Sequence, residues 1–401
     1  IAYDPPDAWT LYFDGSAIPF NPFADDLTAV WLDRNGHIYI SGDPIGGSAL
    51  TFVFAEDSVA RGNVIYNNYG EGLVAGRYTS HITFEDNISY DNDHANVYLN
   101  NTAYPLVQRN IIYCTDDREF WRKAHATDYR PGAGLQIRDE DFNPMPPPGT
   151  GQVIINNIVA GCSTNFGVAT QRPGGGLNNG LVANNVFING RAESPAAVDN
   201  VAFGGSASYT NSRFVNNMII QTVPGDLAFI QGVSDFSTLT VANNLYSSAP
   251  VGWFPGEAGR VIGAPDFING IPPLPTVANP PNAADYLVGY DSPAFDNGQT
   301  LSEVMADYFG NSRLDTGLPD IGVHELPYEG EIIVVQQTVP DGAQQAFGFS
   351  ATYAPHVFSL ADGQEHDSGP LPVGTYSVTV DTLAGWATTG SCDDGSTPDA
   401  I

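Results

Sequence analysis

An asparagine followed by two mostly apolar residues returns seven times in this chain: Asn63-Val-Ile, Asn87-Ile-Ser, Asn110-Ile-Ile, Asn157-Ile-Val, Asn185-Val-Phe, Asn217-Met-Ile and Asn244-Leu-Tyr. The gaps between them are 24, 23, 47, 28, 32 and 27 residues. A period in the twenties, on short Val/Ile-rich runs separated by Gly, Asn and Asp, is typical of stacked repeats. Each repeat therefore predicts one coil of a solenoid.

Each coil offers two further apolar runs. The second runs are Gly72–Ala75, Asn96–Leu99, Gly134–Ile137 and Gly167–Thr170. The third runs, which lead back to the next asparagine, are His81–Phe84, Pro105–Gln108, Gln152–Ile155, Leu181–Ala183 and Arg213–Val215. Three short strands per coil predict an all-β, three-faced parallel solenoid.

The repeated asparagine has a physical reason, because a side-chain amide both donates and accepts and can bond the amide of the coils above and below. A single buried amide would lack partners. The alternative is a turn-favouring Asn at each strand start. The 47-residue gap predicts one coil with excursions at residues 115–132 and 140–151.

At these runs the chain resembles the right-handed parallel β-helix proteins of the pectate-lyase-like superfamily, over about residues 50–327. Three later stretches resemble the closing segment of secreted bacterial β-helix proteins that carry cell-surface anchors. They are Val261–Phe267, Asp291–Gly298 and Asp320–Glu325. Proline-rich sequence around Ile271–Pro275 cannot lie inside a sheet, so we expect this segment to fold back along the last coils, with one short helix at residues 300–309.

The sequence divides into three parts. Residues 1–50 predict a β cap, in which Asn35-Gly36 turns a hairpin between Thr28–Leu32 and His37–Ile40. Residues 51–328 are the β-helix with its closing segment. Residues 329–401 have strands at sandwich spacing, and Thr338–Gly342, Leu371–Thr379 and Gly385-Trp386 resemble the prealbumin-like modules of bacterial surface proteins.

In those modules a last strand with a second Cys normally follows. The partner of Cys392 and that strand are absent before Ile401, so we expect either a longer chain or a strand supplied by another chain. An open edge is a template for strand addition. The alternating Trp9, Leu11 and Phe13 favour Ile1–Phe13 as the donor, which would join copies head to tail into a filament.

Composition limits the compartment and the partners. The chain of 401 residues carries 45 acidic and 14 basic residues, a net charge of −31, which argues against nucleic acid and anionic membranes as partners. No apolar run of membrane-spanning length occurs, and the opening Ile1 indicates a processed or cut piece of a precursor. We expect an extracellular or cell-surface location. Cys114 and Cys162 would lie on stacked coils, as a disulfide or as two buried thiols.

The predicted ligand site lies where the second runs pass the first excursion. Aligned positions bring together polar side chains on neighbouring coils, and the excursion adds aromatic and basic residues. The candidates for ligand binding, with polysaccharide as the ligand, are Glu71, Arg77, His94, Tyr98, Trp121, Tyr129, Gln136 and Arg172. The alternative is structural: Arg77, Arg138 and Arg172 pair with Glu71, Asp139 and Glu140, and Phe120 and Trp121 pin the loop.

The family resemblance implies an enzyme as one of two functions. β-Helix polysaccharide lyases use an Arg or Lys base, often with calcium, so the resemblance implies Arg122, Lys123, His125 and Arg138 as candidate catalytic residues. Asp139, Glu140 and Asp141 are the candidate calcium ligands, because calcium selects oxygen. Arginine is deprotonated only in a specially arranged site.

No strict catalytic motif of the family is present. We therefore favour a structural or adhesive protein of the cell surface, binding copies of itself or other surface proteins, over a lyase or epimerase acting on uronate polysaccharide. The fold alone hosts both.

Overall fold

The computed structural model describes residues 9–13, 16–20, 29–32, 38–41, 48–125, 131–142, 145–191, 199–204, 206–231, 235–313, 317–326, 330–371 and 375–392. The chain divides into two compact units, Ile1–Leu326 and Pro327–Ile401. The sequence placed this boundary between residues 328 and 329. None of the described helices is long and apolar enough to cross a membrane.

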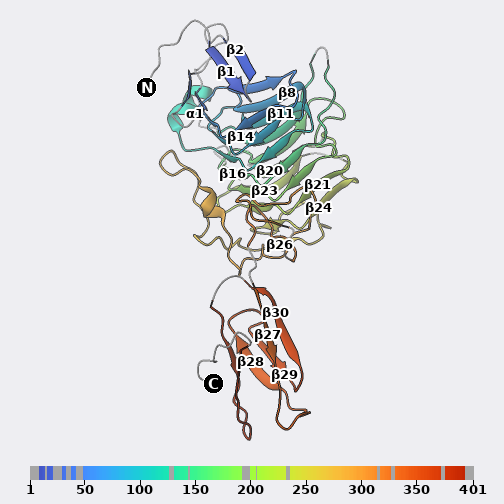
Figure 1. The fold of residues 1–401 in the computed structure, drawn as a ribbon. Coiled ribbons are helices and arrows are strands. Elements are labelled where there is room, and N and C mark those ends of the chain that lie inside the picture. Colours follow the sequence, from blue (N-terminus) through green and yellow to red (C-terminus); the bar gives the residue numbers. More distant parts are fainter. Residues whose placement is uncertain are drawn as a thin grey trace. The chain divides into compact units, whose positions relative to one another are not determined.

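The first unit is a right-handed parallel β-helix of three sheets, as predicted (Figure 1). The first sheet contains the strands that follow the ladder asparagines: β7 (Val64–Tyr66), β10 (Ile88–Tyr90), β13 (Ile111–Tyr113), β16 (Ile158–Ala160), β19 (Val186–Ile188), β22 (Met218–Ile220), β25 (Leu245–Tyr246) and β26 (Val261–Ile262). The hairpin β3 (Ala29–Leu32) and β4 (Ile38–Ser41) extends this sheet at its N-terminal end, with β4 parallel to β7. The turn of this hairpin lies outside the described residues.

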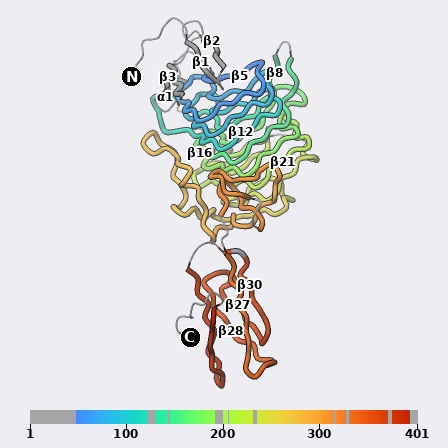
Figure 2. Tube along the Cα trace, in the orientation of Figure 1, coloured from blue at the N-terminus to red at the C-terminus, as the bar shows by residue number. Residues whose placement is uncertain are grey.

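The second and third sheets form from the other two runs of each coil. The second sheet contains β5 (Leu50–Val53), β8 (Leu73–Ser80), β11 (Ala95–Ala103), β14 (Ala133–Asp139), β17 (Phe166–Thr170), β20 (Asp199–Gly204) and β23 (Asp226–Gln231). The third contains β6 (Val59–Arg61), β9 (Thr83–Glu85), β12 (Leu106–Gln108), β15 (Val153–Ile155), β18 (Leu181–Ala183), β21 (Ser212–Val215) and β24 (Leu239–Ala242). Figure 2 follows the coils in sequence order.

The asparagine ladder is continuous from Asn63 to Asn244. In each step the Nδ2 and the backbone N–H of one asparagine donate to the Oδ1 of the next, with Nδ2–Oδ1 distances of 2.9 to 3.1 Å. The 47-residue gap makes the same contact as the others, because Asn110 bonds Asn157 directly. The ladder ends on a carboxylate: Asn244 Nδ2 donates to Glu257 Oε1 at 2.8 Å.

The residue before each ladder asparagine turns the corner in the left-handed region. Asn156, Asn184, Asn216 and Asn243 have φ between 52° and 57°, a conformation that Asn tolerates better than most residues. Their side chains donate to backbone carbonyls of residues 297–322, for example Asn156 Nδ2 to Ala306 O at 2.8 Å. The recurring Asn-Asn pair therefore builds the ladder with its second residue and fastens the closing segment with its first.

The closing segment, residues 261–326, covers the outward side of the first sheet. Its Phe267, Tyr286 and Val323 are buried in one apolar cluster with strand residues such as Ile158 and Ile220. A buried ion pair, Arg313 Nη1 to Glu325 Oε2 at 2.7 Å, lies inside it. The fold-back prediction is confirmed.

The short helix predicted at residues 300–309 is wrong. That stretch forms turns, and the described helix nearby is the one-turn η1 (Ala283–Tyr286). The carboxylate of Asp307 accepts from the backbone N–H groups of Phe309 and Asn311, and such local bonds compete with helix formation.

The second unit contains two antiparallel sheets. One pairs β27 (Gly330–Val335) with β30 (Glu365–Leu371), and the other has the order β29 (Val357–Leu360), β28 (Phe347–Ala351), β31 (Val378–Val380). Phe347, Phe349 and Leu360 form a small core, with Trp386 packed against it.

We predict that the ladder makes a large contribution to stability. Asn157→Ala removes the partner of Asn110 and leaves the carbonyls of Val107 and Ile155 without their Nδ2 donor. Unsatisfied buried groups of this kind should lower the free energy of unfolding by about 3 kcal/mol. Urea denaturation measures the loss, and Asn279→Ala, at an exposed position, is the control. Equal effects of the two substitutions would contradict the ladder's role.

Candidate functional site

The first excursion contains a helix. α1 (Arg118–His125) lies between β13 and β14, where the sequence predicted a loop. Asp117 Oδ1 accepts from the N–H groups of Glu119 and Phe120, so it acts as the N-cap of α1. This Asp, followed by an acidic first turn, is the signal that sequence reasoning missed.

Trp121 does not face solvent. Its side chain is fully buried, and its Nε1 donates to Thr115 O at 3.2 Å. Trp121 and Phe120 pack in one cluster with Cys114 and Cys162. The prediction that Trp121 binds the polysaccharide is therefore wrong, and its alternative role, pinning the excursion, is the one observed. The side chains of Arg122, Lys123 and His125, and all of Tyr129, lie outside the described residues.

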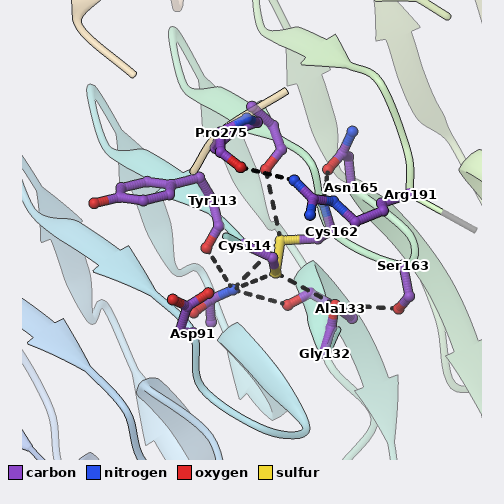
Figure 3. Close-up of a disulfide and its surroundings, with 12 residues drawn as sticks. Asp91, Tyr113, Cys114, Gly132, Ala133, Cys162, Ser163, Asn165, Arg191 and Pro275 are labelled. Atoms are coloured by element: carbon purple, nitrogen blue, oxygen red, sulfur yellow. Dashed lines mark hydrogen bonds between the residues drawn. A yellow bond between two sulfur atoms is a disulfide. The ribbon is translucent and has the colours of Figure 1, made fainter. Parts of the chain in front are cut away.

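Cys114 and Cys162 form a disulfide with a Cα–Cα distance of 4.8 Å (Figure 3). It takes the place of a rung in a second inner ladder of amides that the sequence did not reveal. On one side Asn68 bonds Asn92, Asn92 bonds Asn96, and Asn96 Nδ2 lies 3.3 Å from Cys114 Sγ. On the other side Cys162 N donates to Asn165 Oδ1, and Asn165 bonds Asn200. The irregular spacing of these asparagines hid the second ladder.

The outward side of the second sheet does bring several predicted site residues together. Register places Tyr98 of β11 beside Gln136 of β14, and Tyr98 Oη donates to Glu140 Oε1 at 2.8 Å. His94 Nδ1 lies 3.5 Å from Glu71 Oε1.

These contacts shift the proton affinities. The hydrogen bond to Glu71 raises the pKa of His94, and burial and the bond to Glu140 raise the pKa of Tyr98. Burial alone would raise the pKa of Glu71, but hydrogen bonds from His94 and Ser48 bring it below its usual value. This side of the sheet therefore pairs the Tyr98 hydroxyl and the His94 ring with the carboxyl groups of Glu140 and Glu71.

Asp139 is occupied by the backbone. It is buried, and its carboxylate accepts from the N–H groups of Asn101, Gly149 and Gly176 at 2.9 to 3.1 Å. Glu140 accepts from Tyr98 and Asn100, and Asp141 is exposed. No group of three or more His, Cys, Asp or Glu in the described part of the chain could hold a metal ion. The structure therefore does not support a calcium site at these three carboxylates.

The predicted arginine pairs are not formed either. Arg77 lies over the Phe142 ring, with its Cζ 4.2 Å from the ring centroid, and Arg172 Nη1 donates to Pro146 O. In the part of the chain that the structure describes, Arg77, Arg138 and Arg172 form no ion pair with Glu71, Asp139 or Glu140. Arg77 and Arg172 thus contact the second excursion through an aromatic ring and a carbonyl.

The family described as "Periplasmic copper-binding protein (NosD)" matches residues 10–223, more than half of the chain. The chain belongs to this family. No curated protein matches it. A solved structure described as the complex of XylC with xylose is similar to 70% of this chain, with 13% sequence identity and a TM-score of 0.35. The matched part of this chain spans about half of that protein, 51%.

The name of the NosD family raises the question of copper, which prefers Cys, Met and His ligands. In the described part of this member, Cys114 and Cys162 are joined to each other and Met218 is buried in the apolar cluster, while Cys392, Met145 and Met305 are exposed. Since no metal-holding group of side chains occurs there, the described residues do not fit a copper site.

We predict a pH-dependent effect at Asp91, which accepts from Thr115 N and Oγ1 at 2.6 Å each. Burial, and then the charge of Asp117, raises its pKa to about 6. A raised carboxyl pKa means that the folded state binds the proton more tightly. The free energy of unfolding should therefore fall as pH rises from about 4 to about 6, by on the order of 2–3 kcal/mol from this group.

Asp91→Asn should abolish that part of the pH dependence, since Asn keeps an acceptor for Thr115 N. Denaturant titrations at pH 4 and pH 7 measure the difference, with exposed Asp235→Asn as the control. Identical pH profiles for wild type and Asp91→Asn would refute the assignment.

Proposed function

We propose that this NosD-family protein is a structural or adhesive β-solenoid outside the cytoplasmic membrane, which joins other protein chains through its C-terminal unit. Three observations support the location: the periplasmic description of the family, the buried Cys114–Cys162 disulfide, and the net charge of −31. Disulfides persist in oxidising compartments. The charge disfavours nucleic acid and anionic lipid as partners.

The observation that carries the proposal is the edge of β27. Among the described residues β27 pairs only with β30, so its other edge has no strand partner. Ile333 and Val335 on this strand are 51% and 53% exposed. Unpaired backbone groups beside exposed apolar side chains are the template that strand addition uses.

The partner we propose is a second copy of the chain, added head to tail. The sequence favoured Ile1–Phe13 as the donor, and the structure pairs β1 (Trp9–Phe13) with β2 (Ser16–Phe20) in an antiparallel hairpin. Strand addition by this segment would use the remaining edge of β1 or require the hairpin to open. A repeated head-to-tail contact propagates into a filament when the rotation between copies does not close a ring.

The test is self-association in solution. Ile333→Lys with Val335→Lys places two charges on the open edge and should abolish concentration-dependent association, measured by light scattering. Val251→Lys, at an apolar position of the first unit that is 94% exposed, is the matched control. Deletion of residues 1–13 tests the donor separately. The proposal would be contradicted if the wild type stayed monomeric at every concentration, or if the double variant associated like the wild type.

A uronate lyase or epimerase is the second candidate, favoured by the His94–Glu71 and Tyr98–Glu140 pairs on one side of the second sheet. Such an enzyme needs a base beside the uronate carboxylate. We rank this candidate lower because the Tyr98 hydroxyl is already bonded to Glu140 and the His94 ring already lies against Glu71. Release of unsaturated uronate products that is lost in Tyr98→Phe would reverse the ranking.

A further inference from the structure

A pocket of about 280 Å³ lies on the outward side of the first sheet, beside the closing segment. Its wall on the sheet side comes from the ends of β7, β10 and β13, and its opposite wall from residues 276–280. The residues that the argument uses are Tyr66, Asn67, Tyr90, Asp91, Tyr113 and Asp117. It is separate from the second-sheet site described above.

Three tyrosines form one wall. Tyr66, Tyr90 and Tyr113 occupy the same register position on successive coils, so their rings stack with centroid distances of 4.9 and 4.7 Å and interplanar angles of 3° and 5°. The rings cover each other's faces where they stack, and all three residues line the pocket. Burial raises the pKa of all three, so the hydroxyls are neutral.

The rest of the polar lining consists mainly of acceptors. Asp91 and Asp117 contribute two carboxylates, and none of the described residues that line the pocket is Lys, Arg or His. The side-chain oxygen of Asn67 is buried without a hydrogen-bond partner. Arg191 partly compensates Asp91, but its Nη2 donates to Pro275 O, at 2.7 Å. Figure 3 shows Asp91, Tyr113, Arg191 and Pro275 around the disulfide.

We propose that this pocket binds a small organic amine in its ammonium form. Two carboxylates and a net charge of −31 exclude an anion, and the described residues here supply too few ligands for a metal ion. An ammonium group donates several N–H bonds, which become charge-assisted at a carboxylate. A neutral sugar would lack that added attraction. The inference does not depend on the proposed structural role.

Calorimetric titration of the whole chain with spermidine and putrescine tests the proposal. We expect saturable binding that weakens as ionic strength rises, because screening reduces the attraction. Asp91→Asn with Asp117→Asn should weaken it about tenfold or more, since Asn preserves the cap of α1 and an acceptor for Thr115. Asp235→Asn, an exposed carboxylate outside the pocket, makes a single charge change and should leave the affinity unchanged.

A second variant tests the proposal even if the first variant does not fold. Tyr90→Phe keeps the ring stack and removes one hydroxyl from the wall, and it should weaken amine binding without changing either carboxylate. Glucose and tetramethylammonium, which lack an N–H donor, serve as comparison ligands and should bind more weakly than the amines. No binding of either amine, unchanged binding in both variants, or a preference for glucose would overturn the proposal.

Discussion

The amide ladder from Asn63 to Asn244 is the interaction on which the β-helix depends. A buried amide is costly unless its donors and acceptors are satisfied, and here each asparagine is satisfied by the same residue of the next coil. That requirement holds every coil in register, including the coil interrupted by α1. Register then aligns all other columns, such as the stacked Tyr66, Tyr90 and Tyr113.

The ends and interruptions of the ladders use different chemistry. Glu257 accepts from the last asparagine of the first ladder, and Arg260 pairs with Glu257. In the second ladder the Cys114–Cys162 disulfide replaces a rung and also forms the base on which Phe120 and Trp121 of the excursion pack. A covalent bond in this position joins neighbouring coils at the point where the chain leaves the solenoid.

The candidate binding surfaces lie on the sides of the solenoid that other segments leave uncovered. The closing segment buries most of the outward side of the first sheet in an apolar cluster, and the amine pocket lies where that cover meets the tyrosine stack. The second sheet carries its outward polar pairs, His94–Glu71 and Tyr98–Glu140. In the described part of the second unit, β27 pairs with β30 alone, and we propose its other edge as the surface for another strand.

The sequence by itself determined the coil period, the three strands per coil and the ladder, because these repeat locally and each repeat obeys the same packing rule. The candidate site was only partly predictable. Register brought Tyr98 and Gln136 together as expected. Only the tertiary structure decided that Trp121 turns inward and that the backbone occupies Asp139, since a non-repeating excursion folds according to the neighbours it meets. The second ladder could not be predicted either, because its asparagines contact each other in space but are spaced irregularly along the chain.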